Sequence, residues 1–131
     1  MIDIASHDGL GLAALVRRGE VSAAELLEDA LRRTDASHAA LNAVVTRLDD
    51  AARASVARGA PPGPFGGVPF LVKELVASVA GTASSAASRL YAGNVAAQDS
   101  EIVARYRRAA TSASSHAGHC GSHRTREYYD R

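Results

Sequence analysis

One segment, 63–75, constrains the fold more than any other, with the sequence Gly-Pro-Phe-Gly-Gly-Val-Pro-Phe-Leu-Val-Lys-Glu-Leu. Gly66 and Gly67 allow a close backbone turn, and Pro69 restricts the next residues to an edge strand or a bulge. The apolar residues then predict a short strand over 68–74. That strand contains Lys73, the only lysine of a chain that otherwise takes its positive charge from arginine.

Lys73 has two interpretations on these residues alone. A lysine withdrawn from water can act as a proton acceptor near neutral pH, a role that guanidinium cannot take. Alternatively, its aliphatic stem lets the ammonium reach water from the end of an edge strand.

The clearest helix signal precedes this strand. Ser22 and Glu25 have the spacing of a capping box, and Val21 with Leu26 has that of a hydrophobic staple. A helix is therefore expected over 22–36, and its inner face comprises Leu26, Leu27, Ala30 and Leu31.

Further signals predict the remaining elements. They are a helix over 10–18 ended by Gly19, a strand over 42–48, a helix over 49–57 capped by Asp49, and a helix capped by Asp99 with Ile102, Val103 and Tyr106 on one face.

The segment 63–74 resembles the sequence around the catalytic lysine of the amidase signature family, serine hydrolases with a Ser, cis-Ser, Lys triad. Upstream, 15–28 and 40–46 are similar to that family's N-terminal helices and first strand. Downstream, 79–85 and 99–109 are similar to the loop after the lysine and the next helix. The resemblance covers roughly residues 5–109, in the family's order and spacing.

This resemblance implies an α/β fold: the N-terminal portion of the amidase signature fold, with helices and the first strands of a mixed sheet, left incomplete. It implies carboxamide hydrolysis, a small-molecule amide as substrate, no cofactor, and Lys73 as the catalytic base. The family's Gly-Gly-Ser-Ser-Gly-Gly loop and nucleophilic serine are absent from these 131 residues. We therefore expect a truncated amidase-family hydrolase that is inactive as this chain.

The last part of the chain, Thr111–Arg131, has no Leu, Ile, Val, Phe or Met. This composition suggests a frameshift near codon 110, because a GC-rich gene in the wrong frame yields Ala, Arg, Ser, Gly and His. We therefore divide the chain into 1–110, the N-terminal part of an amidase domain, and 111–131, an unrelated tail. With little apolar area to bury, the tail is expected to be disordered and without contacts to the body.

Two alternatives compete with the amidase interpretation. His116, His119, Cys120 and His123 could hold Zn²⁺ or Ni²⁺, although structural sites usually divide their ligands between two rigid turns. A small non-catalytic protein could instead use its N-terminal helices for interaction. A Ser-Lys dyad inside the chain is disfavoured, because Ser84, Ser85 and Ser88 lie in no Gly-rich turn that could build an oxyanion hole.

Charge and composition limit the partners and the location. The net charge is +1, which gives no support for nucleic acid or an acidic membrane. The amino terminus lacks the features of a signal peptide, and no apolar run approaches the ~20 residues that cross a bilayer, so a cytoplasmic location is expected. Two Phe and no Trp predict a thin core. A strand without neighbours on both edges predicts loose packing or self-association.

Overall fold

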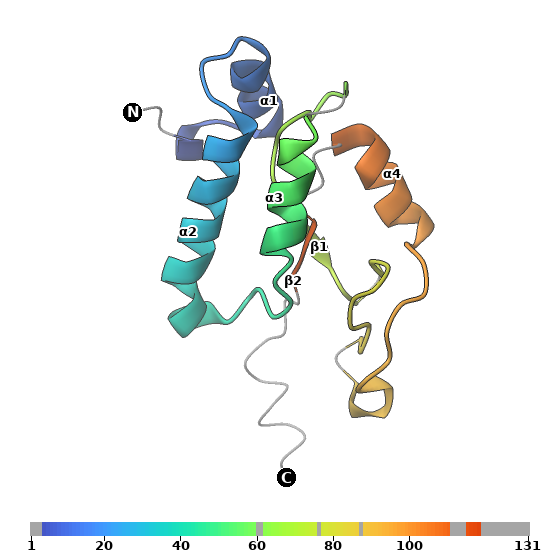
Figure 1. Ribbon diagram of the computed structural model, residues 1–131. Helices are drawn as coiled ribbons and strands as arrows, with labels where there is room; N and C mark the ends of the chain where they lie inside the picture. The colour runs from blue at the N-terminus through green and yellow to red at the C-terminus, as the bar shows by residue number, and fades with distance from the viewer. Residues whose placement is uncertain (1–3, 60–61, 76, 87, 111–114, 119–131) are drawn as a thin grey trace.

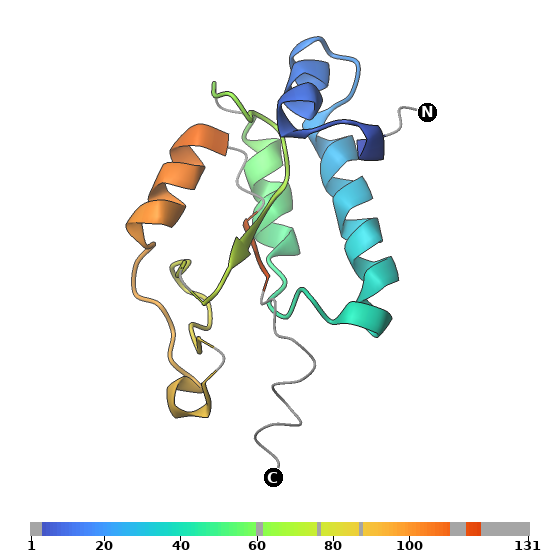
Figure 2. The same ribbon diagram turned by 180° about the vertical axis from the view of Figure 1, so that it is seen from behind.

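The computed structural model describes residues 4–59, 62–75, 77–86, 88–110 and the backbone of 115–118. In chain order the elements are η1 (Ile4–Ser6), α1 (Gly9–Arg17), α2 (Ala23–Leu41), α3 (Asp49–Ala57), β1 (Phe70–Lys73), η2 (Arg89–Tyr91), α4 (Glu101–Ala110) and β2 (Ser115–Gly118). Figures 1 and 2 show α2 and α3 side by side and antiparallel, with α4 across β1 from them.

The first two helices have the ends that the sequence predicts. Gly19 has a φ of 71°, its N–H donates to the carbonyl of Val16, and Glu20 N–H donates to that of Leu15. This pair of bonds is a Schellman motif, which requires a left-handed residue after the helix. Ser22 then opens α2 with both bonds of the capping box to Glu25.

The second helix is longer than predicted, and the strand expected at 42–48 is absent. The helix continues to Leu41 and ends at Asn42, whose φ of 43° is left-handed. Residues 42–48 are irregular; Val44 is buried and Val45 is exposed. A strand needs a partner for its backbone groups, and no described segment pairs with this one.

The third helix spans the predicted residues, but Asp49 does not cap it. Asp49 is its first residue, and no side chain caps it. The Asp49 carboxylate instead accepts from Arg47 Nη2 at 2.6 Å, and Arg47 Nη1 reaches Asp35 of α2, also at 2.6 Å. The Asp49 carboxylate therefore binds a nearby arginine and does not cap the helix.

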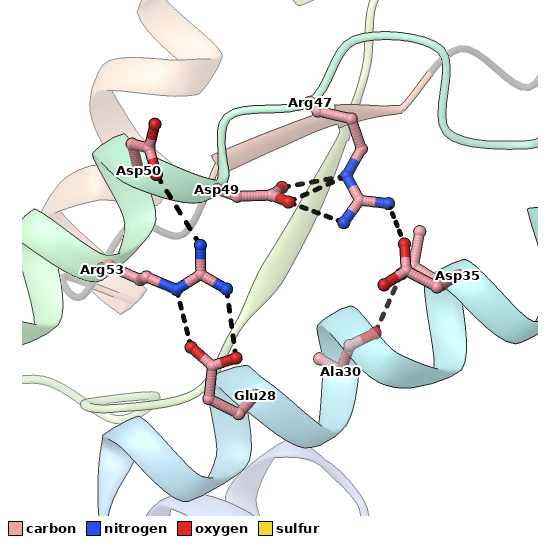
Figure 3. Close-up of polar contacts among 8 residues, drawn as sticks. Glu28, Ala30, Asp35, Arg47, Asp49, Asp50 and Arg53 are labelled. Atoms are coloured by element: carbon pink, nitrogen blue, oxygen red, sulfur yellow. Dashed lines mark hydrogen bonds and ion pairs between the residues drawn. The ribbon is translucent and has the colours of Figure 1, made fainter.

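Two arginines join α2 to α3 (Figure 3). Arg47 bridges Asp49 and Asp35, and Arg53 of α3 makes a two-pronged contact with Glu28 of α2, at 2.7 and 3.1 Å. Exposed pairs of this kind contribute about 0–1 kcal/mol each, so they add little to the stability of the helix pair.

The sequence predicts Asp99 as the cap of the last helix. That prediction is wrong, because the helix begins at Glu101. Asp99 accepts from Ala80 N at 2.8 Å and from Arg107 Nε at 2.7 Å. It thus ties the loop after β1 to α4, a contact that local sequence signals cannot reveal. Of the predicted inner face, Val103 is buried, whereas Ile102 is 40% exposed.

The described sheet consists of β1 and β2, paired in parallel from Phe70↔Ser115 to Lys73↔Gly118. For these four residues of the tail, the prediction of no contact with the body is wrong. Backbone hydrogen bonds need no large side chains, so a segment of Ser, His, Ala and Gly can pair with an open strand edge. The rest of 111–131 lies outside the described residues. Self-association of the chain through an open strand edge stays a prediction.

The core consists of three small clusters built from Leu, Val and Ala. One joins α1 to the start of α2, a second joins α2 to α3, and a third joins Val72 of β1 to Val103 of α4 with Ala77 and Val79. Both phenylalanines are partly exposed, at 38% for Phe65 and 36% for Phe70. The core is thin in the sense predicted, because no described aromatic ring is fully buried in it.

Candidate active site around Lys73

Lys73 is the last residue of β1, and its side chain is exposed. Burial alternates along the segment: Val72 and Glu74 are buried, whereas Leu71, Lys73 and Leu75 are exposed. Successive side chains of an extended strand point to opposite faces, so Lys73 lies on the open face of β1. Of its two interpretations, this placement matches the one in which the ammonium reaches water.

The turn that leads into β1 depends on Gly67. Its φ of 84° is left-handed, and a Cβ at this position would lie 2.9 Å from Val16 Cγ1 and 3.2 Å from Ala23 Cβ. The backbone turn predicted at Gly66 and Gly67 is present, and Gly67 lies closely against the first two helices. The absence of a side chain at Gly67 lets the start of the lysine strand pack against α1 and α2.

Glu74 is a site residue that the sequence analysis missed. Its carboxylate is buried, with the residue 7% exposed, and Oε1 accepts bonds from Ser85 Oγ at 3.0 Å, from Ala86 N at 3.2 Å and from Ser85 N. Ala86 has a φ of 47°, so its amide and that of Ser85 converge on one acceptor, as in an anion-binding nest. The available signal was an acid at a buried position of an alternating strand.

Ser84 and Ser85 lie in the loop after the lysine strand, and Ser88 is the N-cap of η2. Ser84 Oγ is 3.1 Å from Ser78 Oγ, Ser85 binds Glu74, and Ser88 Oγ accepts from Leu90 N. Within the described part of the chain, no hydrogen bond joins any of them to Lys73. The structure thus gives the disfavoured Ser-Lys dyad no geometric support.

Asp99 supplies the second anchor of this loop. Partial burial acts to raise its pKa, but the bonds from Ala80 N–H and Arg107 outweigh that effect and hold the pKa of the Asp99 carboxyl below its ordinary value. Asp99 therefore carries a negative charge in the folded chain at neutral pH.

The predicted metal ligands His119, Cys120 and His123 lie outside the described residues, and His116 is described only as backbone in β2. Among the described residues, no three His, Cys, Asp or Glu side chains form a group that could hold a metal ion. None of the described helices is both long and apolar enough to cross a membrane.

The fold around this site is of the α/β class: among helices, a glycine turn leads to a short strand that ends on lysine. The family model described as Amidase matches residues 25–114. The chain belongs to the amidase family, as the resemblance of its motifs implies.

Curated relatives agree with this assignment. The chain is 43% identical over 118 residues to a glutamyl-tRNA(Gln) amidotransferase subunit of Salinispora arenicola, covering 85% of this chain and 24% of the relative. It is 36% identical over 105 residues to a 6-aminohexanoate-cyclic-dimer hydrolase of Paenarthrobacter ureafaciens, covering 79% and 21%. The chain thus spans about a quarter of the length of the relatives it matches.

A solved structure of 6-aminohexanoate cyclic dimer hydrolase superimposes with a TM-score of 0.74 at 34% identity, covering 84% of this chain and 23% of that one. The predicted fold class is therefore confirmed: helices and short strands that form part of the amidase signature fold.

Proposed function

We propose that this chain carries the lysine part of an amidase active site and that Lys73 is the base of that site. The supporting observation is its position: Lys73 ends β1, inside the family-matched segment and on the open face of the strand. A serine from a further segment of an amidase could approach it there. In the chemistry that the family implies, the neutral amine takes a proton from the cis-serine, which in turn deprotonates the nucleophilic serine.

The chain by itself is proposed to be inactive. Its sequence has neither the Gly-Gly-Ser-Ser-Gly-Gly loop nor the nucleophilic serine that comes after that loop in the family. Members of such a catalytic unit act together, and loss of one member already costs orders of magnitude in rate. We assign 1–110 to the amidase domain and 111–131 to a shifted reading frame, although the family match continues through residue 114.

An assay of the purified chain tests this proposal directly. The panel contains aliphatic and aromatic amides together with the cyclic dimer of 6-aminohexanoate, the compound in the name of one relative. No turnover above background is expected for the chain or for Lys73→Ala. Turnover that is lost in Lys73→Ala but kept in Arg58→Ala, an exposed cation just after α3, would overturn the proposed inactivity.

The gene tests the proposed origin. We expect the few hundred bases after codon 110, read in all three frames, to encode the Gly-Gly-Ser-Ser-Gly-Gly loop. Unrelated sequence in every frame would favour a small stand-alone protein instead. The tail as a metal site, the N-terminal helices as an interaction surface and a cytoplasmic location stay predictions.

A further inference from the structure

Burial of the Glu74 carboxylate costs free energy. A carboxylate removed from water loses favourable hydration, and it is tolerated in an interior only where hydrogen bonds compensate. Here Ser85 Oγ, Ser85 N–H and Ala86 N–H all donate to the same oxygen, Oε1. Bonds to an ionised acceptor are about twice as strong as neutral ones, so this contact is a strong local restraint.

The restraint acts next to the last strand pair that the structure describes, Lys73↔Gly118. The side chain of Glu74 connects the end of the strand to a loop eleven positions later in the chain. Loss of this connection would therefore loosen the strand end that carries Lys73.

The loop that receives Glu74 is itself held at other points. Ser84 N–H donates to Asn94 O at 2.9 Å, Asn94 Nδ2 donates back to Ser84 O at 3.1 Å, and Ala83 pairs with Val95. Ser100 N–H donates to Ser78 O at 2.9 Å, next to the start of α4. Glu74 therefore binds to a loop that is braced on its far side.

We propose that Glu74 is the positioning residue of Lys73. By binding the amides of Ser85 and Ala86, the Glu74 side chain holds its face of the strand against the loop, and Lys73 is thereby directed to the opposite face. The reason is the alternation of an extended chain, since a residue whose neighbour points inward must itself point outward. This inference rests on the proposed function, because the direction of Lys73 matters only if it is a base. A base must reach its proton donor within hydrogen-bond distance, so a strand end that turns freely would lower the fraction of competent geometry.

The single lysine makes the inference testable without an enzyme assay. Labelling with ¹⁵N-lysine gives the amide of Lys73 as the only signal, and its order parameter measures how firmly the strand end is held. We expect about 0.85, the value of rigid backbone, in the unmodified chain and below about 0.6 in Glu74→Ala. Exchange of the amides of Ser85 and Ala86 should become about tenfold faster or more in the same variant, because each loses a charged acceptor.

Two further variants separate positioning from general stability. Glu74→Gln keeps the acceptor but loses its charge, so it should restore part of the Lys73 order and part of the protection at Ser85. Glu101→Ala removes an exposed acid from α4 and should change neither readout. Exchange of the α2 amides should be the same in all variants. If Glu74→Ala fails to fold, the test is the Lys73 order parameter in Glu74→Gln, which should be lower than in the unmodified chain.

Unchanged Lys73 order in both Glu74 variants would overturn the inference, as would an equal rise of exchange throughout α2, which would make Glu74 merely structural. Neither readout involves turnover. A failure of the proposed function would appear separately, as amide hydrolysis by the chain or as unrelated sequence beyond codon 110.

Discussion

The ring of Phe70 in β1 packs against the ring of Tyr106 in α4, with centroids 4.8 Å apart and planes inclined by 56°. The two residues are far apart in the sequence, and their contact joins the lysine strand to the last helix. Tilted aromatic pairs at this separation stabilise beyond the area that they bury.

Tyr106→Ala should therefore loosen α4. Loss of the ring pair is worth about 1 kcal/mol, so we expect amide exchange in the second half of α4 to rise about fivefold. Tyr91→Ala is the matched control, because Tyr91 in η2 is 53% exposed and has no ring partner among the described residues. Equal effects of the two substitutions would contradict the role of the ring contact.

The capping box at the start of α2 provides a second prediction. Ser22→Ala removes the acceptor for Glu25 N–H, which Ser22 Oγ binds at 3.1 Å, and should weaken the first turn by about 1 kcal/mol. Faster exchange at Glu25 and Leu26 would report this loss. Ser22→Asn retains a capping acceptor and should exchange nearly as the unmodified chain does. An Asn variant as weak as the Ala variant would argue against the cap.

Gly67 and Gly59 separate crowding from backbone strain. Both have left-handed φ angles, 84° and 96°, so Ala at either position should cost about 1–2 kcal/mol. Only at Gly67 would the new Cβ meet Val16, at 2.9 Å, whereas nothing described lies within 4 Å of one at Gly59. Gly67→Ala should therefore cost about 1–3 kcal/mol more.

The urea concentration that removes half of the helical circular-dichroism signal measures this difference. Adding Val16→Ala to Gly67→Ala should recover part of the lost stability, because the smaller side chain leaves room for the new Cβ. A double variant no better than the single one would place the cost in the backbone angle alone.

Asp99 predicts an acid-sensitive link between the loop and α4. Its folded-state pKa is held below the ordinary value, so its contribution is fully present above the unfolded pKa, about 3.9. That contribution is lost as the pH falls through the lower, folded-state pKa. Exchange at Ala80, corrected for the intrinsic pH dependence, should rise below about pH 4.

Asp99→Asn should remove most of this pH dependence, since the amide cannot titrate. Asp50→Asn is the control, because the Asp50 side chain is fully exposed and its ion pair with Arg53 is long, at 3.7 Å. A pH profile that persists in Asp99→Asn would assign the transition to another carboxyl.

Features that depend on neighbours in the chain were predictable. The Gly19 motif, the Ser22–Glu25 box and the bounds of α3 follow from backbone angles and hydrogen bonds that span a few residues. The identity of the lysine strand was predictable for the same reason, because Gly67 and Pro69 allow few conformations.

Features that depend on distant partners were not. Residues 42–48 carry strand-forming side chains, but a strand exists only where another backbone accepts its hydrogen bonds. Asp49 and Asp99 look like caps in the sequence, yet each lies within reach of an arginine that only folding brings there. Pairing of Ser115–Gly118 with β1 likewise needs an open edge, not a signal in the segment itself.

The sequence by itself determined the family, the glycine turn and the place of Lys73 at the end of a strand, since all three depend on short stretches of residue type and spacing. Only the tertiary structure decided which face Lys73 takes and that Glu74, its neighbour, is buried against Ser85 and Ala86. The physical reason is that a buried charge is stable only where hydrogen-bond donors converge on it, and these donors come from a loop that the fold, and not the local sequence, brings to the strand.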